Sequence, residues 1–595
     1  MSEYVAPLTD IRFAIERLAP LGAVNALPGY EEATPDLVDA VLDGANQFAS
    51  EILSPLNWPG DRHGAQHTGD GVKTAPGWQE AYREFVDGGW NGVGCDPAFG
   101  GQGLPRVVAT AVAEMWNSAN LSFALCPMLT QGAIDAIEHH GSPEQQAAFL
   151  PRMVSGEWTG TMNLTEPQAG SDLSAVRTRA ERDGGQFRIF GQKIYITYGE
   201  HDLTDNIIHL VLARITGAPA GTRGISLFIV PKFLLDDAGN PGQRNDVRCA
   251  SIEHKLGIHG SPTAVMLYGE KEGAVGYLVG EENRGLEYMF TMMNNARHAV
   301  GLEGVAIGER AYQKAREFAR DRVQGKPTGF TGQGAASIVE HPDVKRMLLT
   351  MKSSTEAMRA LAYVCAGAFD RGAREPDAEK AAYFRRRGDL LTPIVKGWCT
   401  ETGLTLASLG VQVHGGMGFV EETGAAQYLR DARIMPIYEG TTGIQAADLV
   451  GRKTQRDGGQ GARELLTEMR ADQAALAALS DVRAQVIAGQ LDNALTALES
   501  ALEWVLGEGS ADPRLAAAAS VHYLNLWGVV TGGWLLARST LICLAEPGGL
   551  DPDFITAKVA SAQFFATQVL PDAAACERKM RAGSASVVEY ASALL

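Results

Sequence analysis

The order of residue patterns along the chain is the feature that most limits its fold. Residues 33–160 place apolar side chains three and four positions apart, which is typical of amphipathic helices. Residues 161–280 instead contain short runs rich in β-branched residues, such as GISLFIVP, separated by Gly, Asp, Asn and Pro, which is typical of strands. Helical spacing returns at Arg284 and continues to about Lys453. The pattern therefore predicts a β domain between two helical domains.

The rest of the chain adds a further helical region. The Gly-rich segment Lys326 to Ser337 predicts a loop between two long helices, and RDGGQG at Arg456 to Gly461 predicts a linker. The Ala- and Leu-rich residues beyond this linker are expected to be wholly helical. Because 595 residues exceed what one hydrophobic core usually supports, we expect three or four domain-sized units.

Charge and cysteine content exclude several kinds of protein. A net charge of -18 without a Lys/Arg cluster argues against a nucleic-acid partner. Seven scattered cysteines without a CxxC pair argue against a disulfide framework or a zinc site and favour a reducing compartment. The N-terminus lacks the basic and apolar regions of a signal peptide. We therefore expect a cytoplasmic protein without a metal site.

One apolar segment allows two interpretations. Leu515 to Ala537 has no formal charge and is long enough to span a bilayer. It also contains His522, Asn525, Thr531 and glycines, which dilute its hydrophobicity. A helix buried inside a bundle is the favoured interpretation, so no transmembrane segment is expected.

Small and hydroxyl-bearing residues gather at the start of the predicted β domain, in NLTEPQAGSD (Asn163 to Asp172). Gly170 lets backbone approach a ligand closely, and Thr165 and Ser171 offer hydroxyls. Exposed amides in such a turn can receive a flavin or phosphate oxygen. An ordinary turn is the alternative for any one of these features alone.

Five ordered motifs together identify a family. NLTEPQAGSD with KIYITYG (193–199) is followed by EHKLGIHGSPTAVMLYG (253–269), MMNNARHAVG (292–301), GVQVHGGMGFVEE (410–422) and RDARIMPIYEGTTGIQ (430–445). Over about residues 40 to 450 the chain resembles the acyl-CoA dehydrogenase family, although Asn163 stands where a smaller residue is usual.

The resemblance implies a fold that is mainly α with a central β-barrel-like domain. It implies an N-terminal helical domain with an extension (1–160), a middle β domain (161–282), a four-helix bundle (283–455) and an appended helical domain (462–595). It also implies FAD as the cofactor, placed between the middle domain and the bundle.

The resemblance assigns the flavin ring to residues of the middle domain. Leu164 and Thr165 match the pair at the pyrimidine edge of the isoalloxazine, and Thr197 matches the hydroxyl near N5. Tyr195 stands where the family usually has Trp, which keeps an aromatic face against the ring.

Other cofactor residues are expected in the bundle. Arg322 and Gln324 match positions that reach the flavin pyrophosphate of a neighbouring subunit, and Gln412 and Gly416 match a turn that packs against the dinucleotide. Thr441 is a further candidate. A solvated helix end at Arg322 and a plain turn at Gly416 are the alternatives. Each FAD would lie across a subunit interface in a dimer or a dimer of dimers.

Glu439, in IYEGTTG, matches the catalytic base of the family. The reaction needs a carboxylate at the α-carbon on one side of the acyl chain and the flavin on the other. Burial should raise the pKa of Glu439 to about 6–7. Gly440 gives the thioester room to approach, and Ala296 occupies the alternative base position, where it cannot act.

Two further residues are candidates for binding the acyl-CoA substrate. Arg297 matches an arginine near the CoA moiety and the base, with a helix-surface salt bridge as the alternative. Ser171 matches a residue near the acyl-CoA entrance.

The resemblance implies α,β-dehydrogenation to a trans-2-enoyl-CoA, of the fatty acid β-oxidation type, with an electron-transfer flavoprotein as electron acceptor. The N-terminal extension and last helical block resemble a bacterial subgroup of about 600 residues that includes fatty acyl-CoA and 3-methylmercaptopropionyl-CoA dehydrogenases. The latter act in dimethylsulfoniopropionate breakdown. The same fold also suits an oxidase-like enzyme or a non-catalytic acyl-CoA-binding protein, so fold alone does not choose among these functions.

Overall fold

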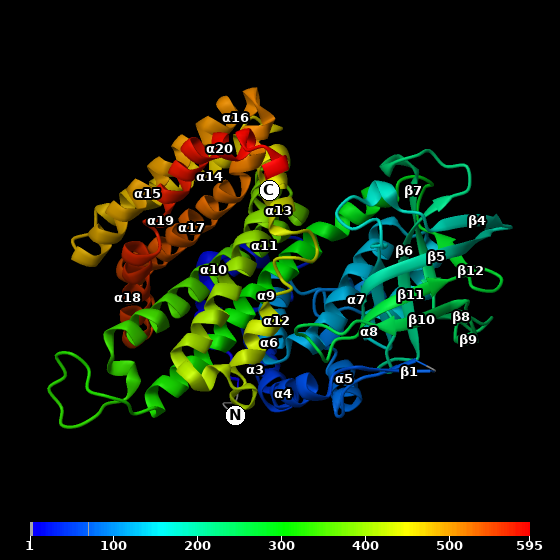
Figure 1. Ribbon diagram of the computed structural model, residues 1–595, viewed down its shortest axis with the longest axis horizontal. Coiled ribbons are helices and arrows are strands. Elements are labelled where there is room, and N and C mark those ends of the chain that lie inside the picture. Colours follow the sequence, from blue (N-terminus) through cyan, green and yellow to red (C-terminus); the bar gives the residue numbers. More distant parts are fainter. Residues whose placement is uncertain (1–3, 70, 595) are drawn as a thin grey trace. The chain divides into compact units, whose positions relative to one another are not determined.

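The computed structural model describes residues 4–69 and 71–594, and its contacts divide the chain into two compact units. The barrel unit comprises residues 47–104 and 119–296, and the helical unit comprises residues up to 46, 105–118 and 297–595. Each unit is drawn in Figure 1 with its elements labelled. The predicted combination of a mainly helical chain with a strand-rich middle region is confirmed.

The barrel closes because one strand pairs on both of its edges. β4 pairs with β5 and also with β6, which completes a ring through β12 and β7. β11 and β10 extend the sheet beyond β5, and β3 extends it beyond β6. The strands are β3 (Trp158–Asn163), β4 (Arg179–Asp183), β5 (Gln186–Thr197), β6 (Asn206–Ile215), β7 (Ile225–Pro231), β10 (Val247–Ile252), β11 (Thr263–Tyr268) and β12 (Ala274–Leu278).

Apolar residues on both faces explain why these segments form buried strands. All of β7 and nearly all of β6 are buried, which fits their continuous apolar sequences. Phe187, Val211, Phe228 and Met266 share one core cluster. A second cluster joins the opposite face of β6 and β7 to the helices α7 (Leu121–His140) and α8 (Pro143–Ser155).

The region predicted to be helical from 33 to 160 also contains a short hairpin, β1 (Gln66–Thr68) and β2 (Gly71–Lys73). These three-residue strands are too short to show a two-residue hydrophobic period, so the sequence did not reveal them. The remaining elements of the barrel unit are α4 (Ser54–His63), α5 (Trp78–Asp87), β8 (Phe233–Leu235) and β9 (Pro241–Arg244).

Three long helices form the frame of the helical unit. They are α9 (Gly285–Asp321), which begins in the barrel unit, α10 (Pro342–Arg374) and α11 (Ala378–His414). The predicted loop from Lys326 to Ser337 is confirmed between α9 and α10, where Figure 1 shows it as a long green excursion. Shorter helices of this unit are α1 (Leu8–Phe13), α3 (Pro35–Phe48), α6 (Arg106–Ala119), α12 (Ala425–Ala432) and α13 (Thr442–Val450).

The segment beyond the predicted linker is helical, as expected. Its main helices are α14 (Gln460–Ala477), α15 (Val482–Leu506), α17 (Pro513–Ala545), α18 (Pro552–Gln568), α19 (Asp572–Arg578) and α20 (Ser584–Glu589). By length and composition α17 could cross a membrane, with a mean hydropathy of 1.4 over its most apolar window. That window is 72% buried inside the protein, which supports the interpretation as a core helix.

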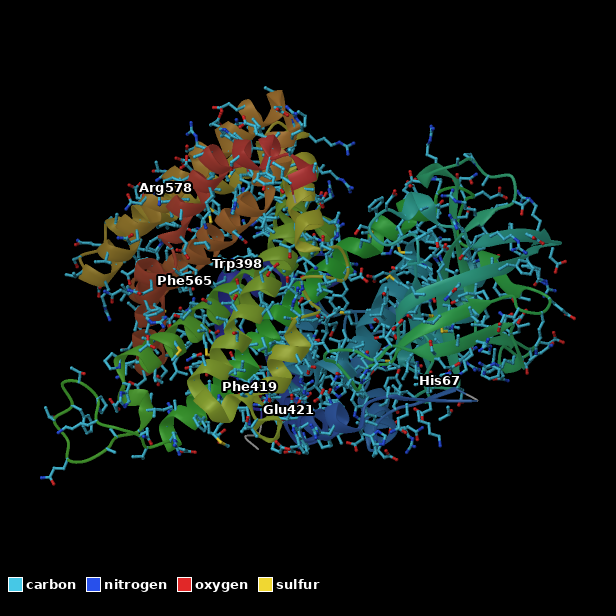
Figure 2. The ribbon with its side chains drawn as sticks, viewed as in Figure 1. His67, Trp398, Phe419, Glu421, Phe565 and Arg578 are labelled. Atoms are coloured by element: carbon cyan, nitrogen blue, oxygen red, sulfur yellow. The ribbon has the colours of Figure 1, made fainter. Side chains whose placement is uncertain are left out.

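A tryptophan from α11 fills a notch in α17. A Cβ atom at Gly528 would lie 2.1 Å from Cγ of Trp398, and one at Gly532 would lie 2.9 Å from Cη2. Phe565 of α18 also lies against Gly532, and Figure 2 labels Phe565 and Trp398. Because glycine has no side chain, the helices approach closely enough to bury Trp398 to 4% exposure.

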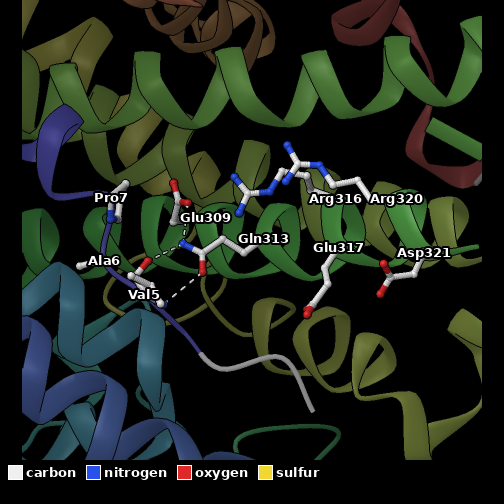
Figure 3. A pocket seen from close by; sticks show the side chains of 9 residues that line it. All are labelled: Val5, Ala6, Pro7, Glu309, Gln313, Arg316, Glu317, Arg320 and Asp321. Carbon is white, nitrogen blue, oxygen red and sulfur yellow. Dashed lines mark hydrogen bonds between the residues drawn. The ribbon is translucent and has the colours of Figure 1, made fainter. Parts of the chain in front are cut away.

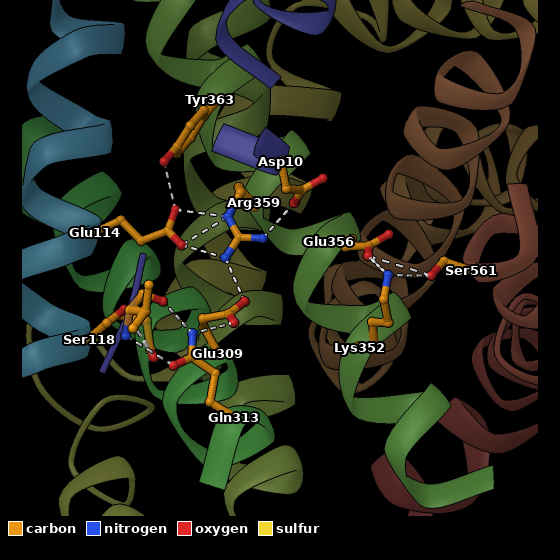
Figure 4. Close-up of polar contacts among 12 residues, drawn as sticks. Asp10, Glu114, Ser118, Glu309, Gln313, Lys352, Glu356, Arg359, Tyr363 and Ser561 are labelled. Carbon is orange, nitrogen blue, oxygen red and sulfur yellow. Dashed lines mark hydrogen bonds and ion pairs between the residues drawn. The ribbon is translucent and has the colours of Figure 1, made fainter. Parts of the chain in front are cut away.

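Buried ion pairs connect distant parts of the helical unit, as Figure 4 shows. Arg359 of α10 is 1% exposed and donates to Glu114 of α6, Glu309 of α9 (2.8 Å) and Asp10 of α1 (2.6 Å). Lys558 of α18 forms an ion pair with the same Asp10. One buried guanidinium therefore links the N-terminal helix to three other helices, and Asp10 extends the network to the C-terminal segment.

Candidate active site

Glu439 lies in a sharply turned loop between α12 and α13, here called the base loop (Met435 to Thr442). Its backbone is left-handed, with φ of 51°, a conformation that costs free energy for a residue other than glycine. Gly440 follows with φ of 89°. The side chain of Glu439 is half-buried. Surrounding contacts must therefore hold the loop in this shape.

Lys396 of α11 supplies two of those contacts. Its Nζ donates to the carbonyl oxygen of Met435 at 2.9 Å and to that of Gly440 at 2.7 Å. The side-chain amide of Gln445 donates to the carbonyl oxygens of Glu439 and Gly440, both at 3.3 Å. The backbone of the base loop is thus tied to two buried side chains.

Burial raises the pKa of Glu439 above its usual value, because removal from water disfavours the charged carboxylate. The positive charges of Lys396 and Arg297 act in the opposite direction. The direction agrees with the sequence-based expectation for this carboxyl group.

Arg297 forms a buried ion pair. Its Nη1 donates to Asp448 of α13 at 2.9 Å, and both side chains are 5% exposed. Arg297 therefore forms a salt bridge, which was the alternative interpretation of this residue from the sequence. The pair is buried, so the expectation that it would lie on the helix surface was wrong. The pair connects α9 to the helix that follows the base loop.

A second carboxyl group, that of Glu303, contacts the base loop. Glu303 of α9 is fully buried, and the Tyr438 hydroxyl donates to one of its oxygens. Burial raises the pKa of Glu303 to about 8, so this group is mostly protonated at neutral pH.

In the barrel unit, the turn after β3 is held by a buried lysine. Nζ of Lys193 donates to the carbonyl oxygen of Leu164 at 3.0 Å and to Glu166 at 2.8 Å. The amide of Ile194 donates to the carbonyl oxygen of Thr165 at 2.9 Å. Leu164 and Thr165 are half-buried, so the turn leaves them accessible while fixing their backbone.

Tyr195 projects from an irregularity in β5. The register with β11 shifts between Ala264 and Met266, and Tyr195 adopts a φ of 59° at this bulge. Its side chain is 61% exposed. Thr197, two residues on, is half-buried. An aromatic face and a hydroxyl are therefore presented close together on one strand, near the turn that holds Thr165.

Asn163, the departure from the family pattern, fills a polar position inside the barrel unit. It is fully buried and its Oδ1 accepts a hydrogen bond from the Tyr268 hydroxyl at 2.7 Å. The larger side chain is accommodated because it has this hydrogen-bond partner.

Another group of predicted residues gathers where α9 and α11 end. The rings of Phe318 and His414 stack with their centroids 4.5 Å apart, which brings the two helix ends together. Four predicted cofactor residues near these ends are exposed: Arg322, Gln324, Gln412 and Gly416.

Ser171 and Thr441 have different surroundings. Ser171 is exposed in the turn after β3. The Thr441 hydroxyl accepts a hydrogen bond from the amide of Ile444 at 3.3 Å and caps α13. Its own proton stays available to a ligand.

A pocket of about 440 Å³ lies elsewhere on the helical unit, between the segment Val5 to Pro7 and the second half of α9 (Figure 3). Arg316 and Arg320 are among its lining residues, and Figure 3 labels both. None of the predicted site residues lines this pocket.

Comparisons with known families cover most of the chain. Residues 39–157, 161–269 and 283–453 match the N-terminal, middle and C-terminal domains of acyl-CoA dehydrogenases. Residues 465–591 match the family described as acetyl-CoA dehydrogenase C-terminal like.

Individual proteins are similar over nearly their whole length. The chain is 50% identical to 3-methylmercaptopropionyl-CoA dehydrogenase of Ruegeria pomeroyi, over 96% of this chain and 97% of the relative. It is 36% identical to the broad-specificity linear acyl-CoA dehydrogenase FadE5 of Mycobacterium tuberculosis, over 96% of both chains. The structure of a Bacillus anthracis acyl-CoA dehydrogenase complexed with FAD shares the fold, with a TM-score of 0.74 and 22% identity, over 96% of this chain and 91% of that chain.

Sequence reasoning missed the residues that hold the site rather than form it. Lys193, Lys396 and Glu303 are fully buried side chains of ionisable residues. Lys396 and Glu303 each interrupt an apolar helical run, LLTPIVKGWC and AVGLEGVAIG. Since an unpaired buried charge is costly, a lone charged residue in such a run is a signal of a polar partner.

Proposed function

Because the chain belongs to the acyl-CoA dehydrogenase family of oxidoreductases, we propose that it removes hydrogen from the α- and β-carbons of an acyl-CoA thioester, with Glu439 as the base. One observation supports this role above all others. Glu439 is a half-buried carboxyl group with a raised pKa on a strained loop whose ends are fixed by Lys396. A positioned carboxylate that binds protons more tightly than usual suits proton removal near neutral pH.

FAD is the cofactor, and when bound it supplies the acceptor for the hydride from the β-carbon. The residues of the barrel unit fit such a group. Leu164 and Thr165 would meet the polar edge of the ring from a turn whose backbone is fixed, Thr197 would donate its hydroxyl, and the exposed Tyr195 ring would pack against the flat surface.

We propose that Arg322, Gln324, Gln412 and Gly416 hold the diphosphate end of FAD bound to a second copy of the chain. Their exposure supports this, because exposed side chains remain open to a partner. Roughly 27 Å separate Glu303, which the base loop contacts, from the end of α9 at about 1.5 Å per residue, so the residues near that end lie far from the base loop. A homodimer, or a dimer of dimers, would then be the functional form.

The chain's own groups account for proton removal. The Glu439 carboxylate would take the α-proton, and its backbone amide would donate to the thioester oxygen, which makes that proton more acidic. Gly440, without a side chain, leaves space for the thioester, and the Thr441 hydroxyl can donate to a bound ligand.

Two classes of acyl group are candidates. Similarity to the Ruegeria enzyme favours 3-methylmercaptopropionyl-CoA, whereas similarity to FadE5 favours linear acyl-CoAs, which would give a trans-2-enoyl-CoA in β-oxidation.

We place Ser171 near the acyl-CoA entrance because it is exposed beside the flavin turn. We propose that Arg297 acts on CoA through the arrangement of α13, since its guanidinium is occupied by Asp448.

We further propose an electron-transfer flavoprotein as electron acceptor and a cytoplasmic location. The division into domains 1–160, 161–282, 283–455 and 462–595 is likewise proposed. The family matches support the boundaries near 160, 283 and 455–462, although the first match begins at residue 39 and the second ends at residue 269.

The substrate class can be tested by anaerobic bleaching of the flavin with a panel of thioesters. We expect 3-methylmercaptopropionyl-CoA to bleach the enzyme at least about tenfold faster than hexadecanoyl-CoA, a difference within what acyl-pocket contacts achieve. Equal rates across linear chain lengths would instead support the broad-specificity candidate. Absence of bleaching with every thioester would contradict the proposed reaction.

The pH dependence should report the environment of Glu439. Because only the ionised carboxylate accepts a proton, the bleaching rate should fall as the pH drops through the raised pKa of Glu439. The acidic limb should therefore lie above the ordinary Glu value of about 4.3. Stopped-flow bleaching across the pH range measures this limb, and a midpoint at or below the ordinary value would contradict the assignment.

A further inference from the structure

We propose that Lys396 is a positioning residue for Glu439: it clamps the base loop by donating to carbonyl oxygens that precede and follow Glu439. This inference rests on the proposed function, since it concerns the residue that the proposed reaction uses as base. Lys396 itself is fully buried on α11 and acts through the backbone of the loop.

The positions of the two acceptors support a clamp. Met435 precedes Glu439 and Gly440 follows it, and a single ammonium group bonds both carbonyl oxygens, at 2.9 and 2.7 Å. The residue between them adopts a left-handed backbone that does not persist without restraint. If the clamp were absent, the ends of the loop would be free to separate and the carboxylate would lose its fixed position.

A second hydrogen bond also restrains the base loop. The hydroxyl of Tyr438, the residue before Glu439, donates to the buried Glu303 of α9. Lys396 and Glu303 come from different helices, so the base loop is fastened to both α9 and α11. The two contacts are separate hydrogen bonds and can be removed one at a time, although the charges of Lys396 and Glu303 also influence each other.

The positive charge of Lys396 also affects the pKa of Glu439. The titratable and charged side chains around the base loop are Arg297 and Glu303 of α9, Lys396 and Glu401 of α11, Tyr438 of the loop itself and Asp448 of α13. Asp448 pairs with Arg297, and Glu303 is mostly protonated because its pKa is about 8. Of the two cations that lower the pKa of Glu439, Lys396 has the larger effect, although burial lowers its own pKa to about 8.

The test is Lys396→Met, which keeps an unbranched side chain but removes both donors and the charge. We expect FAD content to be unchanged and anaerobic bleaching at neutral pH to slow at least about tenfold. Loss of the cation should raise the pKa of Glu439, so the acidic limb should move to higher pH by about one unit. Lys453→Met is the matched control, because it removes a lysine of the same unit that pairs with Asp389 outside the base loop.

Tyr438→Phe separates geometry from charge and keeps the inference testable if Lys396→Met does not fold. It should slow bleaching while leaving the acidic limb in place, because the Lys396 charge remains. Wild-type rates and limbs in both variants would overturn the inference. If the wild type bleaches and Glu439→Gln does not, the proposed function stands regardless of that result, whereas a wild type that never bleaches removes the proposed function itself.

Discussion

Replacing Glu439 with Gln is expected to slow anaerobic flavin bleaching by acyl-CoA by about 10³-fold, within the range that a general base contributes. The amide has nearly the same size and fits the same half-buried position, but it cannot accept the α-proton. The purified variant should remain yellow, since Glu439 is not among the residues proposed to hold FAD. Stopped-flow absorbance of the flavin measures both properties in one sample.

Glu422→Gln is the appropriate control for this variant. Glu422 is an exposed glutamate of the same unit, outside the base loop, so its neutralisation should leave the bleaching rate unchanged. Near-normal bleaching by Glu439→Gln would remove Glu439 from its role, and a colourless variant would show that the substitution disturbed the cofactor site instead.

The second large effect is expected from Arg359→Met, which should reduce the free energy of unfolding of the helical unit by about 3–5 kcal/mol. The substitution leaves the buried carboxylates of Glu114 and Glu309 without their shared cation. Removing one partner of a buried ion network costs more than the network contributes, because the remaining charge stays out of water. Chemical denaturation followed by far-UV circular dichroism measures the loss.

A double variant distinguishes charge from packing as the cause. Adding Glu114→Gln to Arg359→Met removes one of the stranded charges and should recover part of the lost stability. If the double variant is less stable than Arg359→Met by the full cost of a second independent substitution, the loss arises from packing, and the electrostatic explanation is wrong.

The residues proposed to take part in chemistry are easier to recognise in the sequence than those that support them. Glu439 is recognisable because IYEGTTG has a local pattern that requires no knowledge of distant contacts. The carbonyl oxygens that Lys396 bonds lie 39 and 44 residues away, and no local pattern specifies such pairs. The role of Asn163 likewise depends on Tyr268, 105 residues away.

Arg297 shows how burial changes an assignment that was otherwise reasonable. The spacing of residues on α9 indicates an exposed or a partly buried arginine equally well. Asp448, which pairs with Arg297, lies on a separate helix 151 residues further along the chain, so only the folded structure reveals the contact. The residue patterns did predict a β domain and the long helices, because β-branched runs and three-to-four spacing are properties of short segments, whereas the barrel form was implied only by the family resemblance.

The seating of Trp398 between Gly528 and Gly532 has a consequence for how such an enzyme can be shortened or recombined. Deleting the C-terminal helices would expose the Trp398 indole and the apolar surface around it to solvent. Grafting those helices onto a shorter relative would fail for the converse reason, unless the host offered an aromatic plug of matching size. Truncation before these helices is therefore expected to yield an aggregating fragment rather than a minimal enzyme.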